Sequence, residues 1–332
     1  FCLMTVMAGL QKLGVFRNIA KTLLRYTQNT IQLVEVLVLL CFFFSMIITN
    51  DVSLITFVPF TFIVLRLTGE EAVKKLAVPV IVLQTIAANL GSMLTPIGNP
   101  QNLYLYGKTQ MSAGTFILLM LPYSLVSLLL LVICGVIVAK RGGIEVRGAE
   151  VLLTEDEKLE QKKYLLPAYL LLFVLCLLTV AHMIPYPVTL VTVALAVLLL
   201  DRGTIIKVDY SLLLTFVGFF IFIGNMGRMP AFCDFLQKII GGREVMTAVI
   251  ASQVISNVPA ALLLSGFTEN ITALIIGTNL GGLGTLIASM ASLISYKQVA
   301  RQIPGEKKKY FGWFTIANIV FLMILVLENC LL

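Results

Sequence analysis

Two stretches of this sequence combine helix-breaking residues with polar side chains inside long apolar runs. The first break, residues 89–102, reads NLGSMLTPIGNPQN, and the second break, residues 279–285, reads NLGGLGT. A broken helix frees backbone carbonyl and amide groups, which are costly to leave unpaired in lipid. Such a break is tolerated where it lines a cavity or binds a solute, so we interpret both breaks as parts of a binding site. The alternative for residues 89–107 is a loop at the membrane surface.

A polar turn lies upstream of each break. The first tip, residues 49–51, reads TND, and the second tip, residues 256–259, reads SNVP. Each tip lies between two apolar arms, which we interpret as a re-entrant hairpin. For the first tip, a turn between two full spans is the alternative, because Asn and Asp are ordinary turn residues.

We predict two pseudo-symmetric sites, each built from one tip and one break. Asparagine suits a tip because its amide both donates and accepts hydrogen bonds, and glycine lets a solute approach the backbone closely. Asp51 is the only acid in these four elements, so we assign it the coupling role. The candidate substrate- and ion-binding residues are Thr49, Asn50, Asp51, Asn89, Gly91, Thr95, Asn99, Asn102, Ser256, Asn257, Asn279, Gly281, Gly284 and Thr285.

The composition is that of a polytopic, all-α membrane protein. Of the 332 residues, 59% are hydrophobic and 12% are charged, against about 25% charged in soluble domains. Apolar runs such as 116–139 and 165–181 are long enough, or nearly so, to cross a hydrocarbon core of about 30 Å. The net charge of +7 is concentrated in loops, where it sets topology, and it is not the footprint of a nucleic-acid partner.

Neither a metal site nor a catalytic constellation is predicted. The six cysteines are scattered through apolar segments without a CxxC pair, and there is one histidine, His182. We therefore expect no metal ligands and no cofactor, although sodium is considered as an ion for the tips and breaks. Because no nucleophile lies beside a base, the sequence argues against an enzyme.

The chain is an internal duplication. When residues 87–106 are placed over 277–296, seven of the twenty positions are identical, and Ser45 to Asn50 fall on Ser252 to Asn257. We predict a first repeat at 1–140, a cytoplasmic linker at 141–163 and a second repeat at 164–332. The second repeat begins with two additional helices, so we expect that about two helices precede residue 1 in a longer parent protein.

Basic loops give the relative orientation of the repeats. The positive-inside rule places residues 12–25, 66–75, 140–163 and 297–309 in the cytoplasm. The first hairpin then enters from the cytoplasm and the second from outside, so the two repeats are inverted. The segment 225–244, expected to be an outside loop, carries basic residues and fits this scheme less well.

The tips and breaks resemble those of the ion transporter superfamily, which includes divalent-anion/sodium symporters, citrate permeases, arsenite permeases and a class of sodium/proton antiporters. The matching pattern follows the Asn-bearing tip and is carried by Asn89, Gly91, Thr95, Ile97, Gly98, Asn99, Pro100 and Asn102. The resemblance implies two inverted repeats, each with a re-entrant helical hairpin and a broken transmembrane helix. It further implies an elevator-type scaffold with a moving transport domain, a homodimer, and a location in the cytoplasmic membrane of a prokaryote.

The tips depart from the dicarboxylate symporters of this superfamily, whose tips carry Ser-Asn-Thr. Val258 stands where the second threonine is expected and cannot bind a carboxylate, while Asp51 would repel one. The first tip looks more like those of the arsenite permeases and the sodium/proton antiporters.

Three function classes follow from these residues. The first is a secondary transporter that moves a small anion or a metalloid, coupled to protons or sodium, by alternating access. The second is a sodium/proton antiporter, and the third is a membrane enzyme or channel. Broken helices repeated with inversion favour alternating access over the third class.

Overall fold

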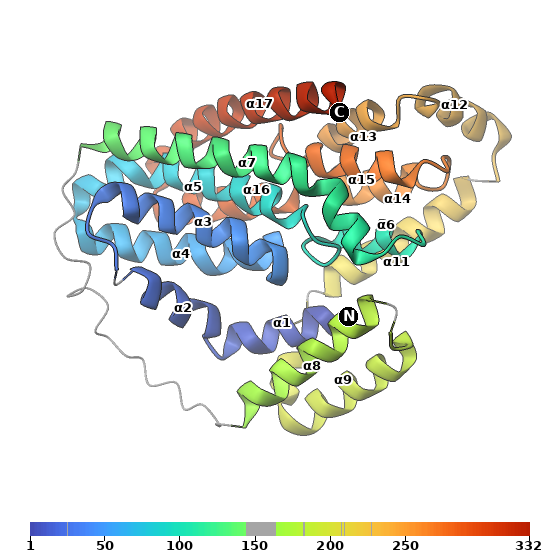
Figure 1. Ribbon diagram of the computed structural model, residues 1–332, viewed down its shortest axis with the longest axis horizontal. Coiled ribbons are helices and arrows are strands. Elements are labelled where there is room, and N and C mark those ends of the chain that lie inside the picture. The colour runs from blue at the N-terminus through green and yellow to red at the C-terminus, as the bar shows by residue number, and fades with distance from the viewer. Residues whose placement is uncertain (25, 144–163, 182, 207, 209, 227) are drawn as a thin grey trace.

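The protein is described by a computed structural model of residues 1–332, apart from residues 25, 144–163, 182, 207, 209 and 227 (Figure 1). Every regular element among the described residues is helical, so the predicted all-helical architecture is confirmed. The α-helices are α1 (Cys2–Lys12), α2 (Val15–Leu24), α3 (Thr30–Ile48), α4 (Asn50–Thr68), α5 (Glu70–Ser92), α6 (Pro100–Gly107), α7 (Ala113–Gly142), α8 (Leu165–Val180), α9 (Tyr186–Leu200), α10 (Arg202–Ile205), α11 (Tyr210–Met226), α12 (Pro230–Ile240), α13 (Glu244–Ile255), α14 (Asn257–Leu264), α15 (Ile271–Leu280), α16 (Met290–Gln302) and α17 (Lys307–Leu331). A 3-10 turn, Pro304–Glu306, precedes α17.

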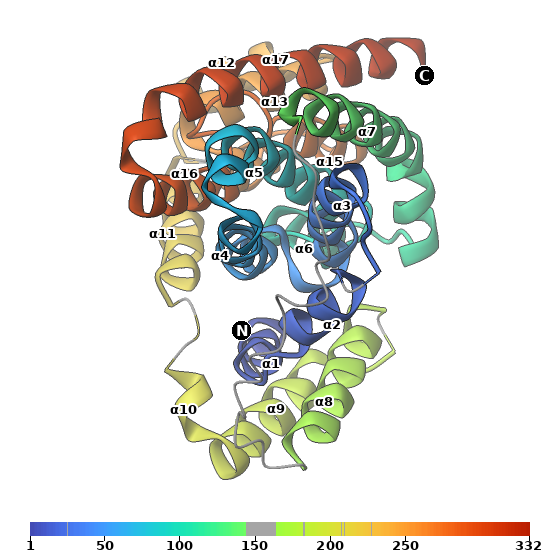
Figure 2. The same cartoon turned by 90° about the vertical axis from the view of Figure 1, so that its left-hand side faces the viewer.

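The helices gather into two bodies. In the smaller body, α1 packs against α8, α9 and α10, and in Figures 1 and 2 this group lies below the rest. The larger body contains α3 to α7 and α13 to α17, so it draws its helices from both halves of the chain. The helix α2 lies between the bodies and contacts α1 on one side and α3 and α4 on the other.

The core of the larger body is built around α5. Every side chain of α5 from Leu76 to Ser92 is buried, which is the expected position for a helix that is apolar on all sides. Gln84, near its middle, donates from Nε2 to the Leu37 carbonyl oxygen at 2.9 Å and to the Thr61 Oγ1 at 2.8 Å. One buried amide therefore connects α5 to α3 and to α4, the two arms of the first hairpin.

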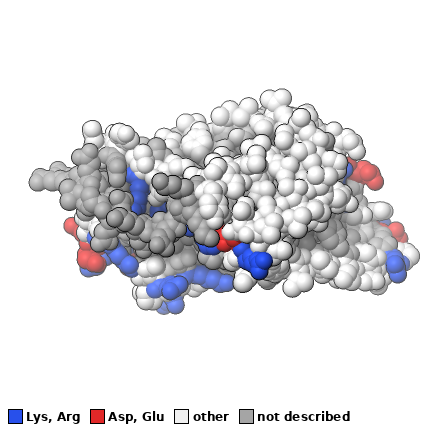
Figure 3. All heavy atoms as spheres, turned by 90° about the horizontal axis from the view of Figure 1, so that it is seen from below, with Lys and Arg blue, Asp and Glu red and all other residues white. Residues whose placement is uncertain are grey.

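Five helices of the described chain are long and apolar enough to cross a membrane, namely α3, α4, α5, α7 and α17 with its preceding 3-10 turn. Large apolar side chains such as Leu118, Leu171 and Leu199 are exposed. The face in Figure 3 is mostly white, with Lys and Arg gathered toward its left and lower parts. In the second hairpin, α13 has 12 residues and α14 has 8, and at 1.5 Å per residue neither crosses about 30 Å alone.

Helix boundaries differ from the sequence-based expectation at two places. The expected loop at 225–244 holds α12, which starts with Pro230 at a position where proline is favoured. The helix α5 continues to Ser92, so Asn89 and Gly91 lie in its last turns and the unwound residues are 93–99. The physical reason is Pro96, whose ring would clash with the Ser92 carbonyl if the helix continued. Residues 144–163 of the predicted linker lie outside the described residues.

An ion pair between Lys12 and Asp201 connects the helices of the smaller body. The Asp201 carboxylate accepts hydrogen bonds from Lys12 Nζ at 2.6 Å, Thr204 Oγ1 at 2.8 Å and Tyr169 Oη at 3.2 Å. Burial raises the pKa of Asp201, but the hydrogen bonds from Lys12, Thr204 and Tyr169 and the charge of Lys12 outweigh burial, so the pKa lies below its usual range.

We expect Asp201→Asn to destabilise the protein at neutral pH by about 1.5–3 kcal/mol, the range for a hydrogen bond to a charged group. A carboxylate with a depressed pKa contributes stability above the unfolded-state pKa of about 3.9 and loses it as the pH falls through the folded-state value. The Tm difference between wild type and variant, followed by scanning fluorimetry, should therefore stay constant from about pH 8 to 5 and shrink below about pH 4. A difference that persists unchanged in acid would contradict this assignment.

Candidate functional site

The first tip contacts the first break. α3 and α4 are joined through Thr49 alone, whose φ of 74° and ψ of 154° are costly for a residue with a Cβ. The Asn50 backbone N–H donates to the Gly98 carbonyl at 3.2 Å, and its Nδ2 donates to Asn89 Oδ1 at 3.1 Å. The Thr95 hydroxyl donates to the Met46 carbonyl at 2.5 Å. The unwound segment is therefore held directly against the tip of the hairpin.

The second tip repeats this arrangement. Ser256 joins α13 to α14 with φ 72° and ψ 152°, and among the described residues only Thr49 and Ser256 have a positive φ without being glycine. The Asn257 backbone N–H donates to the Ala288 carbonyl at 2.9 Å, and the Thr285 hydroxyl donates to the Gln253 carbonyl at 3.1 Å. These bonds join positions equivalent to those of the first tip and break.

Glycines at equivalent positions allow both contacts. A Cβ on Gly91 would lie 2.6 Å from Ser45 Oγ, and a Cβ on Gly281 would lie 2.6 Å from Ser252 Oγ. Real Cβ atoms do not approach other atoms so closely, so each of these glycines lets a broken helix pack against a hairpin arm.

The two sites meet in one buried cluster of amides, which we call the asparagine cluster. It consists of Asn50, Asn89, Asn99, Asn102, Asn257, Asn279 and Ser289, all of which are buried. The Ser289 hydroxyl donates to Asn89 Oδ1 at 2.9 Å, and Asn99 Nδ2 donates to Asn279 Oδ1 at 3.0 Å. In each case the residue that caps the helix after one break binds the asparagine of the other break.

The predicted glycines are also buried, whereas the remaining predicted tip residues and the two threonines of the breaks are more accessible. Thr49, Asp51, Thr95 and Ser256 are half-buried and Thr285 is exposed. The Asp51 backbone N–H donates to Asn50 Oδ1 at 2.9 Å, so the acid follows directly on the buried amide. The structure thus brings together buried amides and a rim of hydroxyls with one carboxylate.

Gly284 lies apart from the asparagine cluster, against the side chain of Gln253. Its φ of 106° is accessible to glycine and unfavourable for other residues.

Sequence reasoning missed Gln253 and Ser289. Gln253 Nε2 donates to the Gly281 and Leu283 carbonyls at 3.1 and 2.9 Å, and its Oε1 accepts from the Thr285 N–H at 2.9 Å. The signal for Gln253 was a lone amide three residues before the second tip in an apolar arm. The signal for Ser289 was its position opposite Asn99 in the alignment of the repeats.

The donor set suits a solute that needs hydrogen bonds more than charge. An amide offers both a donor and an acceptor, and carbonyls freed by unwinding can accept from a solute or contact a cation. Groups of His, Cys, Asp and Glu that could hold a metal ion do not occur within the part of the chain that the structure describes.

Known proteins resemble this chain over most of its length. A family model described as citrate transporter matches residues 1–272. An uncharacterized transporter of Methanocaldococcus jannaschii is 33% identical over 292 residues, which are 87% of this chain and 76% of that protein. The inner membrane protein YbiR of Escherichia coli is 32% identical over 308 residues, or 89% of this chain and 77% of YbiR. A silicon efflux transporter of Oryza sativa is 31% identical over 137 residues, covering 40% of this chain and 27% of that protein.

Proposed function

The chain belongs to the citrate transporter family, within the ion transporter superfamily, and is an integral multi-pass membrane protein; we therefore propose that it is a secondary active transporter. In this proposal it moves a small anion or a metalloid, coupled to protons or sodium, by alternating access. The observation that carries the proposal is the recurrence of one tip-to-break arrangement at equivalent positions in the two halves. The relatives named as transporters favour this class over an enzyme.

Inverted repeats are part of the proposal. Equivalent contacts at Asn50 and Asn257 agree with a duplicated unit, and the basic loops give the two units opposite orientations. The reciprocal bonds of Ser289 to Asn89 and of Asn99 to Asn279 support units that face each other across a pseudo-two-fold axis. Two hairpins that dip from opposite faces then meet at a single solute site near the membrane midplane.

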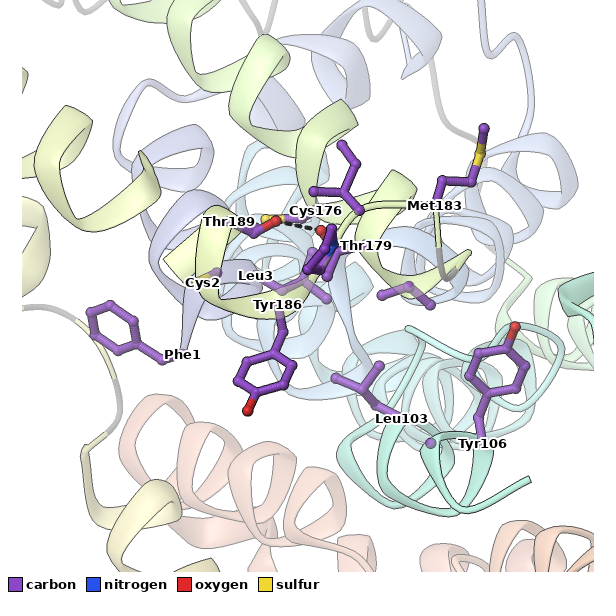
Figure 4. A pocket seen from close by; sticks show the side chains of 14 residues that line it. Phe1, Cys2, Leu3, Leu103, Tyr106, Cys176, Thr179, Met183, Tyr186 and Thr189 are labelled. Carbon is purple, nitrogen blue, oxygen red and sulfur yellow. Dashed lines mark hydrogen bonds between the residues drawn. The ribbon is translucent and has the colours of Figure 1, made fainter. Parts of the chain in front are cut away.

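Alternating access requires a moving part, and the two bodies supply candidates for it. We assign the larger body, which holds both tips and both breaks, to the transport domain, and the smaller body to the scaffold. An apolar cavity of about 600 Å³ separates them, lined by α1, α6, α8 and α9 (Figure 4). Leu103 and Tyr106 of α6 lie across it from Tyr186 of α9. A mostly apolar boundary with few hydrogen bonds allows the two bodies to slide past each other, as an elevator mechanism requires. Assembly as a homodimer belongs to the same proposal.

The site chemistry favours a metalloid or a weakly charged oxyanion over citrate. The tips and breaks contain no lysine or arginine, and the Val258 side chain offers no hydrogen bond at the second tip. A trianion without a cationic partner is costly to bury, whereas a hydroxylated solute matches amides and hydroxyls that both donate and accept. The silicon efflux transporter among the relatives supports this choice.

A sodium/proton antiporter is the second candidate, and Asp51 is the observation that favours it. A carboxylate at a hairpin tip, next to backbone carbonyls freed by a break, is a group that can exchange a proton for a cation.

Thermal stabilisation of the purified protein tests both functions. A ligand that binds the folded state raises the Tm, by an amount that grows with its concentration over Kd. The panel contains sodium, lithium, a pH series, citrate, succinate, sulfate, phosphate and arsenite. A shift with an anion or metalloid, strengthened by sodium or low pH, supports the coupled carrier. A shift with sodium or pH that no solute changes supports the antiporter, and a panel without any shift contradicts the assigned site.

A further inference from the structure

A groove on the larger body lies away from the tips and breaks. It is bounded by α5, α7 and α17 and encloses about 450 Å³. The three helices contact one another, and in Figure 1 they run alongside one another in the upper part of the larger body. The asparagine cluster contributes no residue to this groove.

One end of the groove is basic. Lys74 and Lys75 come from the start of α5, Arg141 from the end of α7 and Lys309 from the start of α17, and all four residues are exposed. Lys75 pairs with Glu71 at 2.7 Å and Lys309 with Glu306 at 3.0 Å. Lys74 and Arg141 have no ion pair among the described residues, so this end presents a surplus of positive charge.

Contacts between the helices bring these cations to one level. A Cβ on Gly142, next to Arg141, would lie 2.6 Å from Leu76 Cδ2, so the end of α7 lies against the first turns of α5. Lys309 Nζ donates to the Lys74 carbonyl oxygen at 3.1 Å, which joins the first turn of α17 to the first turns of α5. The positive-inside rule places this level at the cytoplasmic surface.

The rest of the groove is apolar. Trp313 lies one turn along α17 from Lys309 and is 40% exposed, and Ile316 and Val320 continue the same wall with 68% and 48% exposed. Ile137 of α7 and Leu83 of α5 form the facing sides. Tryptophan prefers the boundary between headgroups and hydrocarbon, so Trp313 divides a basic headgroup region from an apolar acyl region.

We propose that this groove binds an anionic phospholipid. The phosphate-bearing headgroup lies against Lys74 and Arg141, and one acyl chain lies along Trp313 and Ile316. Basic pockets between transmembrane helices on the cytoplasmic side recognise anionic headgroups in this way. The apolar part of the groove accommodates the acyl chain of such an amphipathic ligand. Charge complementarity selects an anionic over a zwitterionic lipid. Because α5 and α17 belong to the larger body, the lipid is bound to the proposed transport domain.

The chain provides its own reporter, since Trp313 is its only tryptophan. The full chain is titrated in detergent micelles with brominated phosphatidylglycerol or brominated phosphatidylcholine, and quenching of the fluorescence is measured. We expect half-maximal quenching at a mole fraction at least about fivefold lower with phosphatidylglycerol. The preference should weaken with salt, because exposed charges are screened.

Two double variants distinguish lipid binding in this groove from a general effect of surface charge. Lys74→Gln with Arg141→Gln should bring the ratio of the two half-maximal mole fractions close to one. Lys297→Gln with Arg301→Gln removes the same charge from α16 at the same face, outside the groove, and should leave the ratio unchanged. Equal quenching by the two lipids in the wild type, or equal loss in both double variants, overturns the proposal. Quenching by neither lipid, together with a dimer that Ile316→Arg dissociates, makes the groove an interface between copies of the chain and also overturns it.

Discussion

Asp51→Asn should abolish proton-coupled transport while leaving the protein folded. The substitution keeps the size of the side chain and removes its ability to exchange a proton, and Asp51 is the only acid in the tips and breaks. In proteoliposomes carrying a pH-sensitive dye, the proton flux driven by a solute or sodium gradient should fall by at least about tenfold, equivalent to about 1.4 kcal/mol. The solute is the one that raises the Tm of the wild type.

Two controls make this result specific. Asp234→Asn removes one acid from an exposed position of α12, outside the tips and breaks, and should transport at the wild-type rate. The Tm of Asp51→Asn should stay within a few degrees of the wild type, because Asp51 is half-buried and its backbone bond to Asn50 remains. Transport by Asp51→Asn with an unchanged pH dependence would contradict the coupling role. Loss of proton movement with sodium-driven solute uptake intact would instead identify sodium as the coupling ion.

The correspondence between residues of the two halves was predictable because sequence identity marks it directly. Asn89 and Asn279 align, and the same offset brings Asn99 opposite Ser289. In the structure Asn99 donates to Asn279, and Ser289 donates to Asn89 in the equivalent way. The bonds themselves were not predictable, since they cross between repeats and depend on how two broken helices are arranged in space. An alignment within one chain reports equivalent positions but not which of them meet.

Helix ends were predicted less well than helix positions. The break was expected to start at Asn89, yet the helix runs to Ser92 because a proline disrupts bonding four residues before itself. The segment 225–244 was expected to be an outside loop, yet it holds the helix α12, whose apolar residues are interrupted by Asp234 and Lys238. That interruption is typical of a short amphipathic helix at an interface, and α2, which is also amphipathic, takes the equivalent place before the first hairpin.

Gly91→Ala should cause a large loss of stability. A Cβ at Gly91 would collide with the Phe42 carbonyl oxygen and lie 2.6 Å from Ser45 Oγ, at the contact that holds the first break against α3. Overpacking of this kind costs about 1–3 kcal/mol, although alanine is otherwise the better helix former. Scanning fluorimetry at one fixed heating rate should show a lower Tm. Gly107→Ala is the matched control, because a Cβ there has no neighbour within 4 Å and α6 should be unaffected.

The second repeat allows a sharper test of the same packing argument. Gly281→Ala should also destabilise, but its closest neighbours are the Oγ and Cβ of Ser252 at 2.6 and 2.8 Å, which belong to a side chain. Ser252→Ala removes the nearer atom and should recover part of the loss caused by Gly281→Ala. Ser45→Ala should recover much less of the loss caused by Gly91→Ala, because the Phe42 carbonyl belongs to the backbone and stays in place. The two double-mutant cycles measure this difference as coupling energies. Equal recovery in both repeats would mean that α3 moves away from α5 freely, and the close approach would not then hold the first break at its tip.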